Sequence, residues 1–476
     1  MAENRTGNAI KNSGASILYK VSHMLVQFVI RTAFIMLLGK EYTGISSLFT
    51  DILTVLSLMD LGMGSAMIFS LYKPMAEEDS QRIASLMDFY KRAYHLIGMA
   101  VIVVGFACVP FLQYIVKGVP NIKEDIRLIF IMYVLTSASS YFLVYKTVLL
   151  RANQRSRVIS KVNTIAEIVE CILEVVLLLV FKQFMIYLVI RLVGALSRNI
   201  ILTGITRKEF PQYLTVKADR KLSREEVNAL FKDITALGIY KVSGVMVYST
   251  PSIIISAFVS TAEVAVVGCY MMINNSVRTM IEQIVESVKP SIGNLAATSS
   301  REKQERVFDT MNFMAFAVSC FCCTCLYVLL DPFVTEIWFN SSYAVTEKLI
   351  LVLVINFFIA VMVYPVESFR TANGLFVQGK WRPAIMAVLN VSLSIIFVQY
   401  WGVVGVYFAA VVSRVSTQVW FDAYLVYKYV FRKRPWKYYC DYAVKFAITC
   451  ASCFTAKQIA DIDFIGNIYL HFLYRM

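Results

Sequence analysis

Residues 13–38 read SGASILYKVSHMLVQFVIRTAFIMLL, a mostly apolar stretch whose length decides the fold class. A helix rises about 1.5 Å per residue, so a stretch of this length crosses the roughly 30 Å hydrocarbon core of a bilayer. Eleven similar segments follow along the chain. The twelve predicted spans lie at residues 13–38, 44–71, 92–115, 127–149, 158–181, 184–206, 228–257, 263–288, 308–330, 346–369, 383–400 and 402–426.

The composition agrees with a membrane protein. Hydrophobic residues make up 58% of the chain and charged residues 16%, against roughly 45–50% and 25% in soluble domains. No segment alternates as a barrel strand does, so helical packing is the way to satisfy the backbone in lipid. With a thirteenth segment near 440–460 and a short final stretch at 464–474, we predict an all-α integral membrane protein of about 12 to 14 transmembrane helices.

The positive charges lie at one side of the predicted topology. The net charge is +14, and the basic residues cluster in the loops within 73–92, 146–161, 207–224, 301–306, 380–382 and 432–437. The opposite loops carry little beyond Lys40, Lys117, Lys123 and Lys182. By the positive-inside rule, we expect a multi-pass protein of the cytoplasmic (plasma) membrane with a cytoplasmic N-terminus, no removable signal peptide and no nucleic-acid partner.

Two short echoes suggest an internal repeat. The Tyr-Lys-Val-Ser run at 19–22 recurs at 240–243, and the Leu-Arg-Ala-Asn run at 150–153 has a counterpart in Arg-Thr-Ala-Asn at 370–373. Each pair lies six helices apart, which predicts two pseudo-symmetric six-helix lobes around a central cavity. Ser223 is expected to cap a short helix on the membrane surface. The predicted division is an N-terminal lobe at 1–206, a cytoplasmic connecting loop at 207–227, a C-terminal lobe at 228–430 and a C-terminal extension with one or two further hydrophobic segments at 431–476.

The first span carries a polar stripe. Lys20, His23, Gln27 and Arg31 follow helical spacing and share one face. Lys20 recurs as Lys241 in the second half, and two such lysines would form a positive, substrate-binding cavity for an anionic group such as a pyrophosphate. The alternative is that Lys20 and Arg31 extend to opposite interfaces while His23 and Gln27 bond neighbouring helices.

The second span holds an acidic residue where charge is costly. Asp60 lies in a stretch with two glycines, and we expect it to pair with a cation such as Lys20, in either a structural or a gating role. Pro251 and Pro365 are expected to kink their helices, which is compatible with hinges but also common without a function.

Two other spans carry rows of charge that are candidates for gating or coupling. Glu167, Glu170 and Glu174 form one acidic face that Arg191 and Arg198 can neutralise. A second row alternates in sign and can neutralise itself; it consists of Arg278, Glu282 and Glu286. Both rows are compatible with a coupling carboxylate or with purely structural ion pairs.

The sequence lacks the usual apparatus of an enzyme or pump. Four cysteines cluster at 320–325, but they lie in an apolar helix without nearby His or carboxylate, so we interpret them as packing residues rather than metal or redox groups. No Walker, zinc or nucleophile-elbow motif occurs, and no large loop domain is present. We therefore expect no enzymatic activity, no cofactor and no metal.

Several motifs together resemble a known family. They are the Tyr-Lys-Val-Ser start, LxDLGxG at 58–64, IFSLYKP at 68–74, LLRANQR at 149–155 and NGLFVQGKWRP at 373–383. In this order they resemble the polysaccharide transporter and O-antigen flippase branch of the MOP superfamily, across residues 10–430.

The resemblance implies two six-helix lobes that open a central cavity alternately to each side. It also implies a flippase for an undecaprenyl-pyrophosphate-linked oligosaccharide, with Lys20, Arg31 and Lys241 as cavity cations. Membrane lipids and the polysaccharide polymerase machinery would be further partners. A MATE-type exporter of small molecules is the alternative, and a polymerase or ligase is less compatible because no sizeable outer loop is seen.

Overall fold

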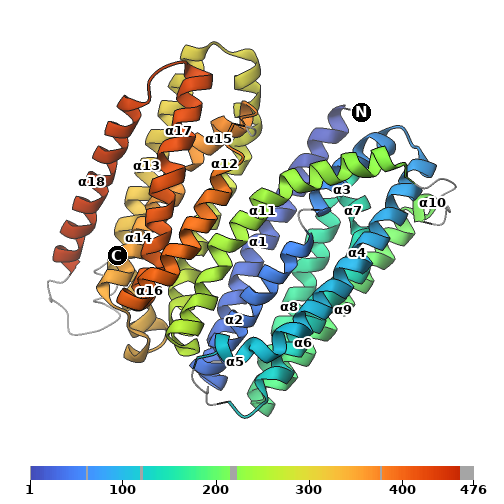
Figure 1. The fold of residues 1–476 in the computed structure, drawn as a ribbon, viewed down its shortest axis with the longest axis horizontal. Helices are drawn as coiled ribbons and strands as arrows, with labels where there is room; N and C mark the ends of the chain where they lie inside the picture. Colours follow the sequence, from blue (N-terminus) through green and yellow to red (C-terminus); the bar gives the residue numbers. More distant parts are fainter. Residues whose placement is uncertain (1, 61–62, 118–121, 215–221, 376–377, 461–476) are drawn as a thin grey trace. The chain divides into compact units, whose positions relative to one another are not determined.

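We describe the protein from a computed structural model that covers residues 2–60, 63–117, 122–214, 222–375 and 378–460. Its described elements are all helical (Figure 1). The chain forms two compact units, Met1–Val245 and Met246–Met476. The boundary falls inside one long helix, whereas the division into lobes at 207–227 stays a prediction.

Unit 1 is built from helices that pack pairwise. In the main contacts α1 lies against α8, α6 lies against both α4 and α9, and α8 lies against α9. Its elements are α1 (Ala2–Leu38), α2 (Lys40–Leu56), η1 (Ser57–Asp60), α3 (Met63–Ala76), α4 (Ser80–Cys108), η2 (Val109–Phe111), α5 (Leu112–Ile115), α6 (Ile126–Val144), η3 (Tyr145–Thr147), α7 (Val148–Ala152), α8 (Ser156–Phe181), α9 (Phe184–Glu209), α10 (Pro211–Leu214) and the first part of α11 (Arg224–Phe258).

Unit 2 contains the rest of α11 and a second set of packed helices. Here α13 lies against α14 and α18, α14 against α16, and α12 against α15. Its elements are α12 (Thr261–Thr298), α13 (Arg301–Pro332), η4 (Phe333–Trp338), η5 (Ser341–Tyr343), α14 (Glu347–Met362), α15 (Tyr364–Ala372), α16 (Arg382–Arg414), η6 (Val415–Val419), α17 (Trp420–Val426), η7 (Tyr427–Phe431) and α18 (Trp436–Ala460).

The α16 stretch is two antiparallel helices that turn at Gly402. This residue has φ +56° and ψ −134°, a conformation that suits glycine. Across the turn, Asn390 bonds Ser413 and the Ser394 hydroxyl bonds the carbonyl of Val406. A Cβ on Gly405 would collide with the Phe397 backbone, so this glycine lets the two helices approach closely. The predicted spans 383–400 and 402–426 are therefore separate neighbouring helices.

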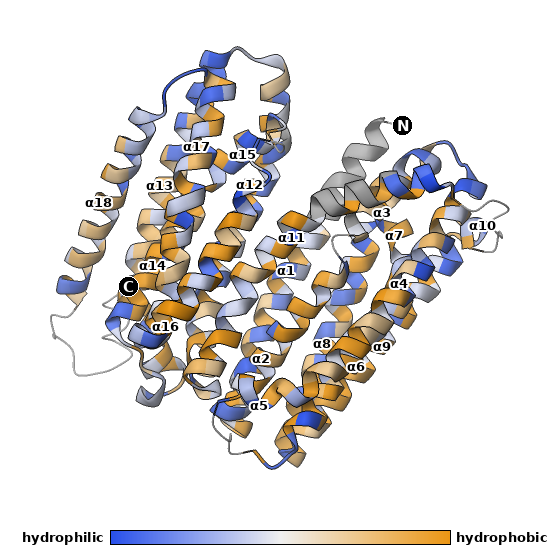
Figure 2. Ribbon diagram, viewed as in Figure 1, coloured by the Kyte–Doolittle hydropathy of each residue, from blue (hydrophilic) through white to orange (hydrophobic). Residues whose placement is uncertain are grey.

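All twelve predicted spans fall on helices. Eight helical stretches among the described residues are long and apolar enough to cross a bilayer. Helices α8, α11 and α12 are also long but carry more charge. Hydrophobic residues predominate along most of the long helices (Figure 2). Phe69, Leu96 and Phe321 are each more than 70% exposed. Soluble monomers rarely expose such continuous apolar surface, so lipid is the natural solvent for these helices.

The thirteenth predicted segment also forms a helix. α18 packs against α13, and two of its charges neutralise each other. Lys445 is buried, lies 2.6 Å from Asp441 and sits over the Phe316 ring, while Asn312 of α13 also donates to Asp441. The stretch 464–474 lies outside the described residues.

Ser223 caps a helix, but not the short surface helix that was predicted. Its hydroxyl accepts from the Glu226 backbone N–H at 3.2 Å, while the Glu226 carboxylate accepts from the Ser223 N–H at 2.7 Å. This reciprocal pair is a capping box. The helix that it starts is the 35-residue α11, which continues through Pro251 without a break. Pro365, in contrast, lies in the first turn of α15, just after α14 ends.

One echo in the sequence corresponds to a repeated backbone structure. α7 and α15 both end at an asparagine, Asn153 or Asn373, and the next residue has positive φ in each case: Gln154 at 57° and Gly374 at 67°. In both places the next two N–H groups bond back to the carbonyls three and five residues earlier. Both ends are Schellman motifs, one in each unit.

Candidate functional site

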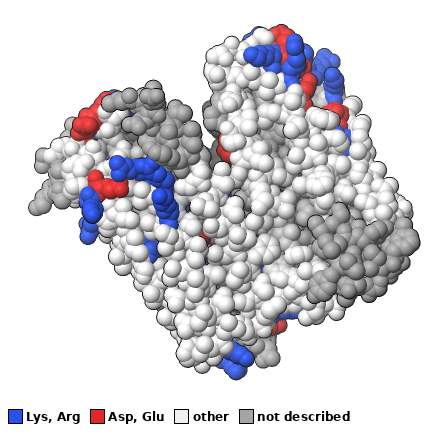
Figure 3. Space-filling model, turned by 180° about the vertical axis from the view of Figure 1, so that it is seen from behind, with Lys and Arg blue, Asp and Glu red and all other residues white. Residues whose placement is uncertain are grey.

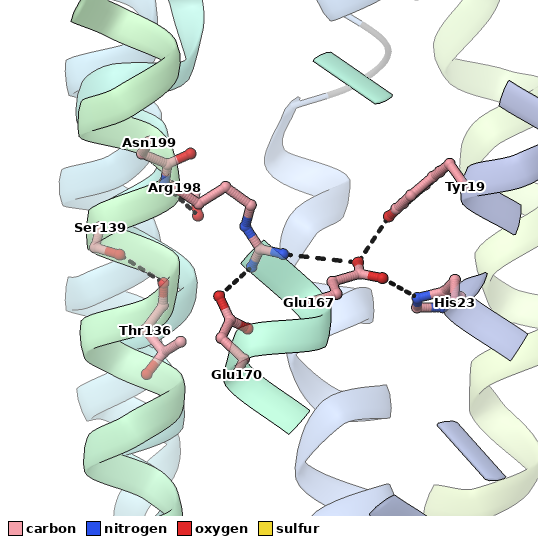
Figure 4. A network of polar contacts seen from close by, with 9 residues as sticks. Tyr19, His23, Thr136, Ser139, Glu167, Glu170, Arg198 and Asn199 are labelled. Carbon is pink, nitrogen blue, oxygen red and sulfur yellow. Dashed lines mark hydrogen bonds and ion pairs between the residues drawn. The ribbon is translucent and has the colours of Figure 1, made fainter. Parts of the chain in front are cut away.

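Glu167 on α8 joins three helices of unit 1 (Figure 4). Its carboxylate accepts a hydrogen bond from the Tyr19 hydroxyl at 2.8 Å and one from His23 Nδ1–H at 3.0 Å, both on α1. The guanidinium of Arg198 on α9 lies 3.7 Å from Glu167 and 3.9 Å from Glu170. Charges within membrane helices are costly unless they are paired or face water, so this network is either functional or a specific structural clamp.

A groove opens beside this network between α8 and α9. It has a volume of about 470 Å³, and its walls are apolar apart from Glu170, Ser197 and Arg198. A Cβ on Gly194 would collide with the Glu170 carboxylate, so glycine leaves the space that this carboxylate occupies. The Glu170–Arg198 pair therefore borders an apolar groove on the flank of the unit.

Arg191 and Glu174 lie one level further along the same helices. Arg191 donates to the Tyr187 hydroxyl at 3.0 Å and stacks over the Tyr133 and Tyr187 rings. Glu174 is only 3% exposed and interacts electrostatically with Arg191, without an ion pair shorter than 4 Å. Both arginines therefore interact with the predicted acidic row. Arg198 lies at Glu167 and Glu170, and Arg191 lies near Glu174.

The predicted stripe on α1 is only partly joined to this network. His23 belongs to it, whereas Arg31 donates to Ser47 of α2 at 2.8 Å. Lys20 and Gln27 are exposed and make no hydrogen bond or ion pair with any residue that the structure describes. Lys20 is therefore the member of the stripe whose charge is available to a ligand.

Asp60 pairs with Lys241 rather than with Lys20. The Lys241 Nζ lies 2.6 Å from Asp60 Oδ2, within unit 1. Helix α2 ends at Leu56, and Asp60 lies at the end of the 3₁₀ turn that follows, where α11 reaches it. Helical periodicity could not foresee which of two lysines would meet this carboxylate. The expected pairing of Asp60 with a cation is confirmed, but Lys20 as the example of that cation is wrong, and the charge of Lys241 is largely neutralised by Asp60.

The predicted self-neutralising row on α12 is also wrong. No ion pair within 4 Å joins Arg278 to Glu282, and Glu286 pairs instead with Lys289. Arg278 turns to Tyr248 of α11 and donates to its hydroxyl at 3.1 Å. An aromatic partner on a neighbouring helix offers a hydrogen bond and a cation–π contact together, which an i+4 carboxylate on the same helix does not.

A buried ion cluster lies elsewhere in unit 2. Asp422 is 1% exposed, with Arg382 Nε at 3.1 Å and Arg370 Nη1 at 3.7 Å. Arg370 lies three residues before the NGLFVQGKWRP motif and Arg382 is its penultimate residue, so this cluster holds the two ends of the motif together. A buried carboxylate shared by two guanidinium groups is typical of a structural anchor.

Comparison with known proteins identifies the family. The sequence model of the family described as "Polysaccharide biosynthesis protein" matches residues 9–289, more than half of the chain. The chain belongs to this family. No curated protein sequence matches it significantly.

Solved structures show that this polysaccharide biosynthesis protein has the fold of the MOP superfamily. The lipid II flippase MurJ, in an inward closed conformation, has a TM-score of 0.69 at 13% identity, covering 98% of this chain and 96% of the other. An inward-facing multidrug resistance MATE transporter has a TM-score of 0.62 at 15% identity, covering 82% and 91%. A MATE transporter from Vibrio cholerae has 0.60 at 13%, covering 86% and 93%. The predicted superfamily and the all-α membrane fold are confirmed.

Sequence reasoning overlooked two buried charged residues of unit 2. Arg414 and Asp422 both lie within the predicted span 402–426, and a charge inside a span was a signal that could have found them. Their partners come from other helices, and a pattern along one helix does not show such partners. Among the described residues, no group of His, Cys, Asp and Glu is suited to hold a metal ion.

Proposed function

We propose that the protein is a flippase that moves an undecaprenyl-pyrophosphate-linked oligosaccharide across the cytoplasmic membrane by alternating access. The observation that carries this proposal is the family match over residues 9–289, which contain the α1–α8–α9 network and the Lys241–Asp60 pair. The fold shared with a lipid II flippase supports it. Transport of this kind requires no covalent chemistry, and we propose no enzymatic activity.

The distribution of charge supports a cytoplasmic N-terminus. Lys and Arg side chains gather mainly at one end of each unit, with few on the apolar flanks (Figure 3). Arg82 lies in the first turn of α4 and Arg155 just before α8 in unit 1, and Lys433 lies between η7 and α18 in unit 2. Because basic ends stay in the cytoplasm, we place these ends on the side where the lipid-linked precursor is made.

In this mechanism the α1 cations meet the anionic linker. Lys20 is exposed and has no described partner, so it is placed to make first contact with a diphosphate. Lys241 would join it only when its pair with Asp60 opens. We propose that an incoming diphosphate competes with Asp60 for the Lys241 ammonium. Binding of the diphosphate would then break the contact between η1 and α11 that this ion pair makes.

The network at Glu167 is proposed to couple α1 to α8 and α9 during this change. Glu167 holds α1 through Tyr19 and His23, and Arg198 ties it to α9. When α1 moves, these bonds must therefore break, or α8 and α9 must move together with α1. Glu170, Glu174, Arg278 and Glu282 remain candidates for gating or coupling on the same grounds, and the protein is proposed to work beside membrane lipids and the polymerase machinery that uses the flipped glycan.

Export of small molecules is the second candidate function, favoured by the likeness to MATE transporters. The test is depletion of the protein in its own cells. A flippase predicts that the lipid-linked glycan accumulates and becomes inaccessible to a membrane-impermeant label added outside, while efflux of small organic cations is unchanged. Undiminished labelling together with loss of cation efflux would establish the exporter instead.

A further inference from the structure

Two arginines of unit 2 converge on one tyrosine. Arg278 Nη1 of α12 lies 3.1 Å from the Tyr248 hydroxyl oxygen, and Arg414 Nη2 at the end of α16 lies 3.4 Å from the same oxygen. Both guanidinium groups also lie over the Tyr248 ring, at 4.9 and 5.7 Å from its centroid. Two helices, α12 and α16, thus bring one positive charge each to a phenol on a third helix, α11.

This pair of arginines has no counter-ion in contact. No carboxylate of a described residue lies within 4 Å of either guanidinium, and the Nε of each is buried without a hydrogen-bond partner. Glu282 and Glu367 act on the cluster only from a longer range. Asp422, the buried carboxylate of this unit described above, pairs with Arg370 and Arg382. A neutral phenol cannot balance two adjacent cations in the middle of membrane helices.

One side of the cluster is buried in the unit, and the other side is exposed at its surface. Arg414 is only 7% exposed, whereas Tyr248 is 55% exposed. A ligand can therefore reach the arginines over the tyrosine, and the burial of Arg414 keeps its fork in place. Guanidinium forks bind phosphate and carboxylate groups through paired, charge-assisted hydrogen bonds.

We propose that Arg278, Arg414 and Tyr248 form an oxyanion-binding site for the anionic part of the transported molecule. This rests on the proposed function for the identity of that molecule, but the site stands on its own geometry. Two parts of such a molecule could supply the oxyanion: the diphosphate linker, or the carboxylate of an acidic sugar. The Tyr248 hydroxyl lies between the two guanidinium groups, at the place that we propose for the oxyanion.

The test is calorimetric titration of the full chain in detergent micelles, at constant ionic strength, with inorganic pyrophosphate and with glucuronate. The site predicts binding that weakens at least about tenfold in both Arg278→Gln and Arg414→Gln, as expected for one lost charge-assisted hydrogen bond. Arg434→Gln, a change in an exposed loop, is the matched control and should bind as the unchanged protein does. Tighter binding of pyrophosphate identifies the linker as the source, and tighter binding of glucuronate identifies the sugar.

A purely structural role for the arginines gives a different result. In that case neither anion binds, or both arginine variants bind it unchanged, and the proposal is overturned. Where an arginine variant does not fold, Tyr248→Phe decides: it keeps the ring and removes the competing hydroxyl, so binding should be as tight or tighter, and weaker binding contradicts the site. Because binding is measured without transport, its failure alongside intact glycan flipping rejects only this site.

Discussion

At the scale of single residues, the pairing of Asp60 with Lys241 changes how the cationic site is understood. The sequence identified both residues as costly charges within spans, and both do lie inside unit 1. What it could not provide was the partner, because an ion pair between distant helices depends on packing that a single-helix pattern does not contain. Lys20 is the exposed cation of α1, whereas Lys241 is paired with Asp60.

The Asp422 cluster leads to a stability prediction. Asp422→Ala leaves Arg370 and Arg382 buried without their shared counter-ion, which should cost about 3–5 kcal/mol of unfolding free energy. The matched control is Asp88→Ala, because Asp88 forms an exposed i,i+4 pair with Arg92 at 2.7 Å. Such pairs contribute about 0.3–0.5 kcal/mol. Thermal unfolding in detergent compares the two variants, and equal losses would refute a structural anchor at Asp422.

The capping box leads to a prediction about pH. The backbone N–H of Ser223 and then the Arg82 guanidinium, 2.6 Å away, lower the pKa of Glu226 below its usual 4.5. A lowered pKa in the folded state contributes stability above pH 4.5, and this stability is lost as the pH falls through the lowered value. Glu226→Gln should therefore remove part of the loss of stability below pH 4.5. Unfolding midpoints measured from pH 7 to 3 check this, and identical acid profiles for the two proteins would contradict it.

At the scale of secondary structure, the two Schellman ends provide a matched experiment. Gln154 has a left-handed conformation that costs most side chains about 1–2 kcal/mol, whereas its counterpart Gly374 has none of this cost. Gln154→Gly should raise the unfolding free energy by up to about 1 kcal/mol, and Gly374→Ala should lower it by about 1 kcal/mol. Space is not limiting, since a Cβ at Gly374 meets nothing within 4 Å.

Opposite signs in the two variants support equivalent turns in the two halves, and equal signs contradict them. The measurement is chemical unfolding of each purified variant in the same detergent. The echo in sequence pointed to these turns, but it could not indicate their geometry, because Gln and Gly differ in their preference for positive φ.

The elements themselves were largely predictable. The apolar segments located the helices of the predicted spans, and the turn at Gly402 coincides with the first residue of the last predicted span. The start of α11 was harder, because the polar residues 224–233 resemble a surface segment although they continue into a membrane helix. Its capping box shows why: Ser223 fixes where the helix begins, and nothing in its first turn stops it.

At the scale of the whole molecule, composition and motif order were enough to predict an all-α membrane protein of the MOP superfamily. The site was less predictable. The spacing of the acidic row predicted that Arg198 neutralises Glu167 and Glu170. The convergence of Arg278 and Arg414 on Tyr248, in contrast, brings α16 to α11 and α12, which are far from it in sequence. Contacts of that kind arise only from the tertiary fold.

The central claim is that the protein moves a polyprenyl-pyrophosphate glycan across a membrane. The most direct test is translocation of a fluorescent polyprenyl-pyrophosphate oligosaccharide in proteoliposomes, followed by an impermeant quencher. The account predicts flipping by the intact protein, loss of flipping in Lys20→Ala and Lys241→Ala, and normal flipping in the exposed control Lys433→Ala. No flipping by the folded intact protein across several donor sugars would contradict the account.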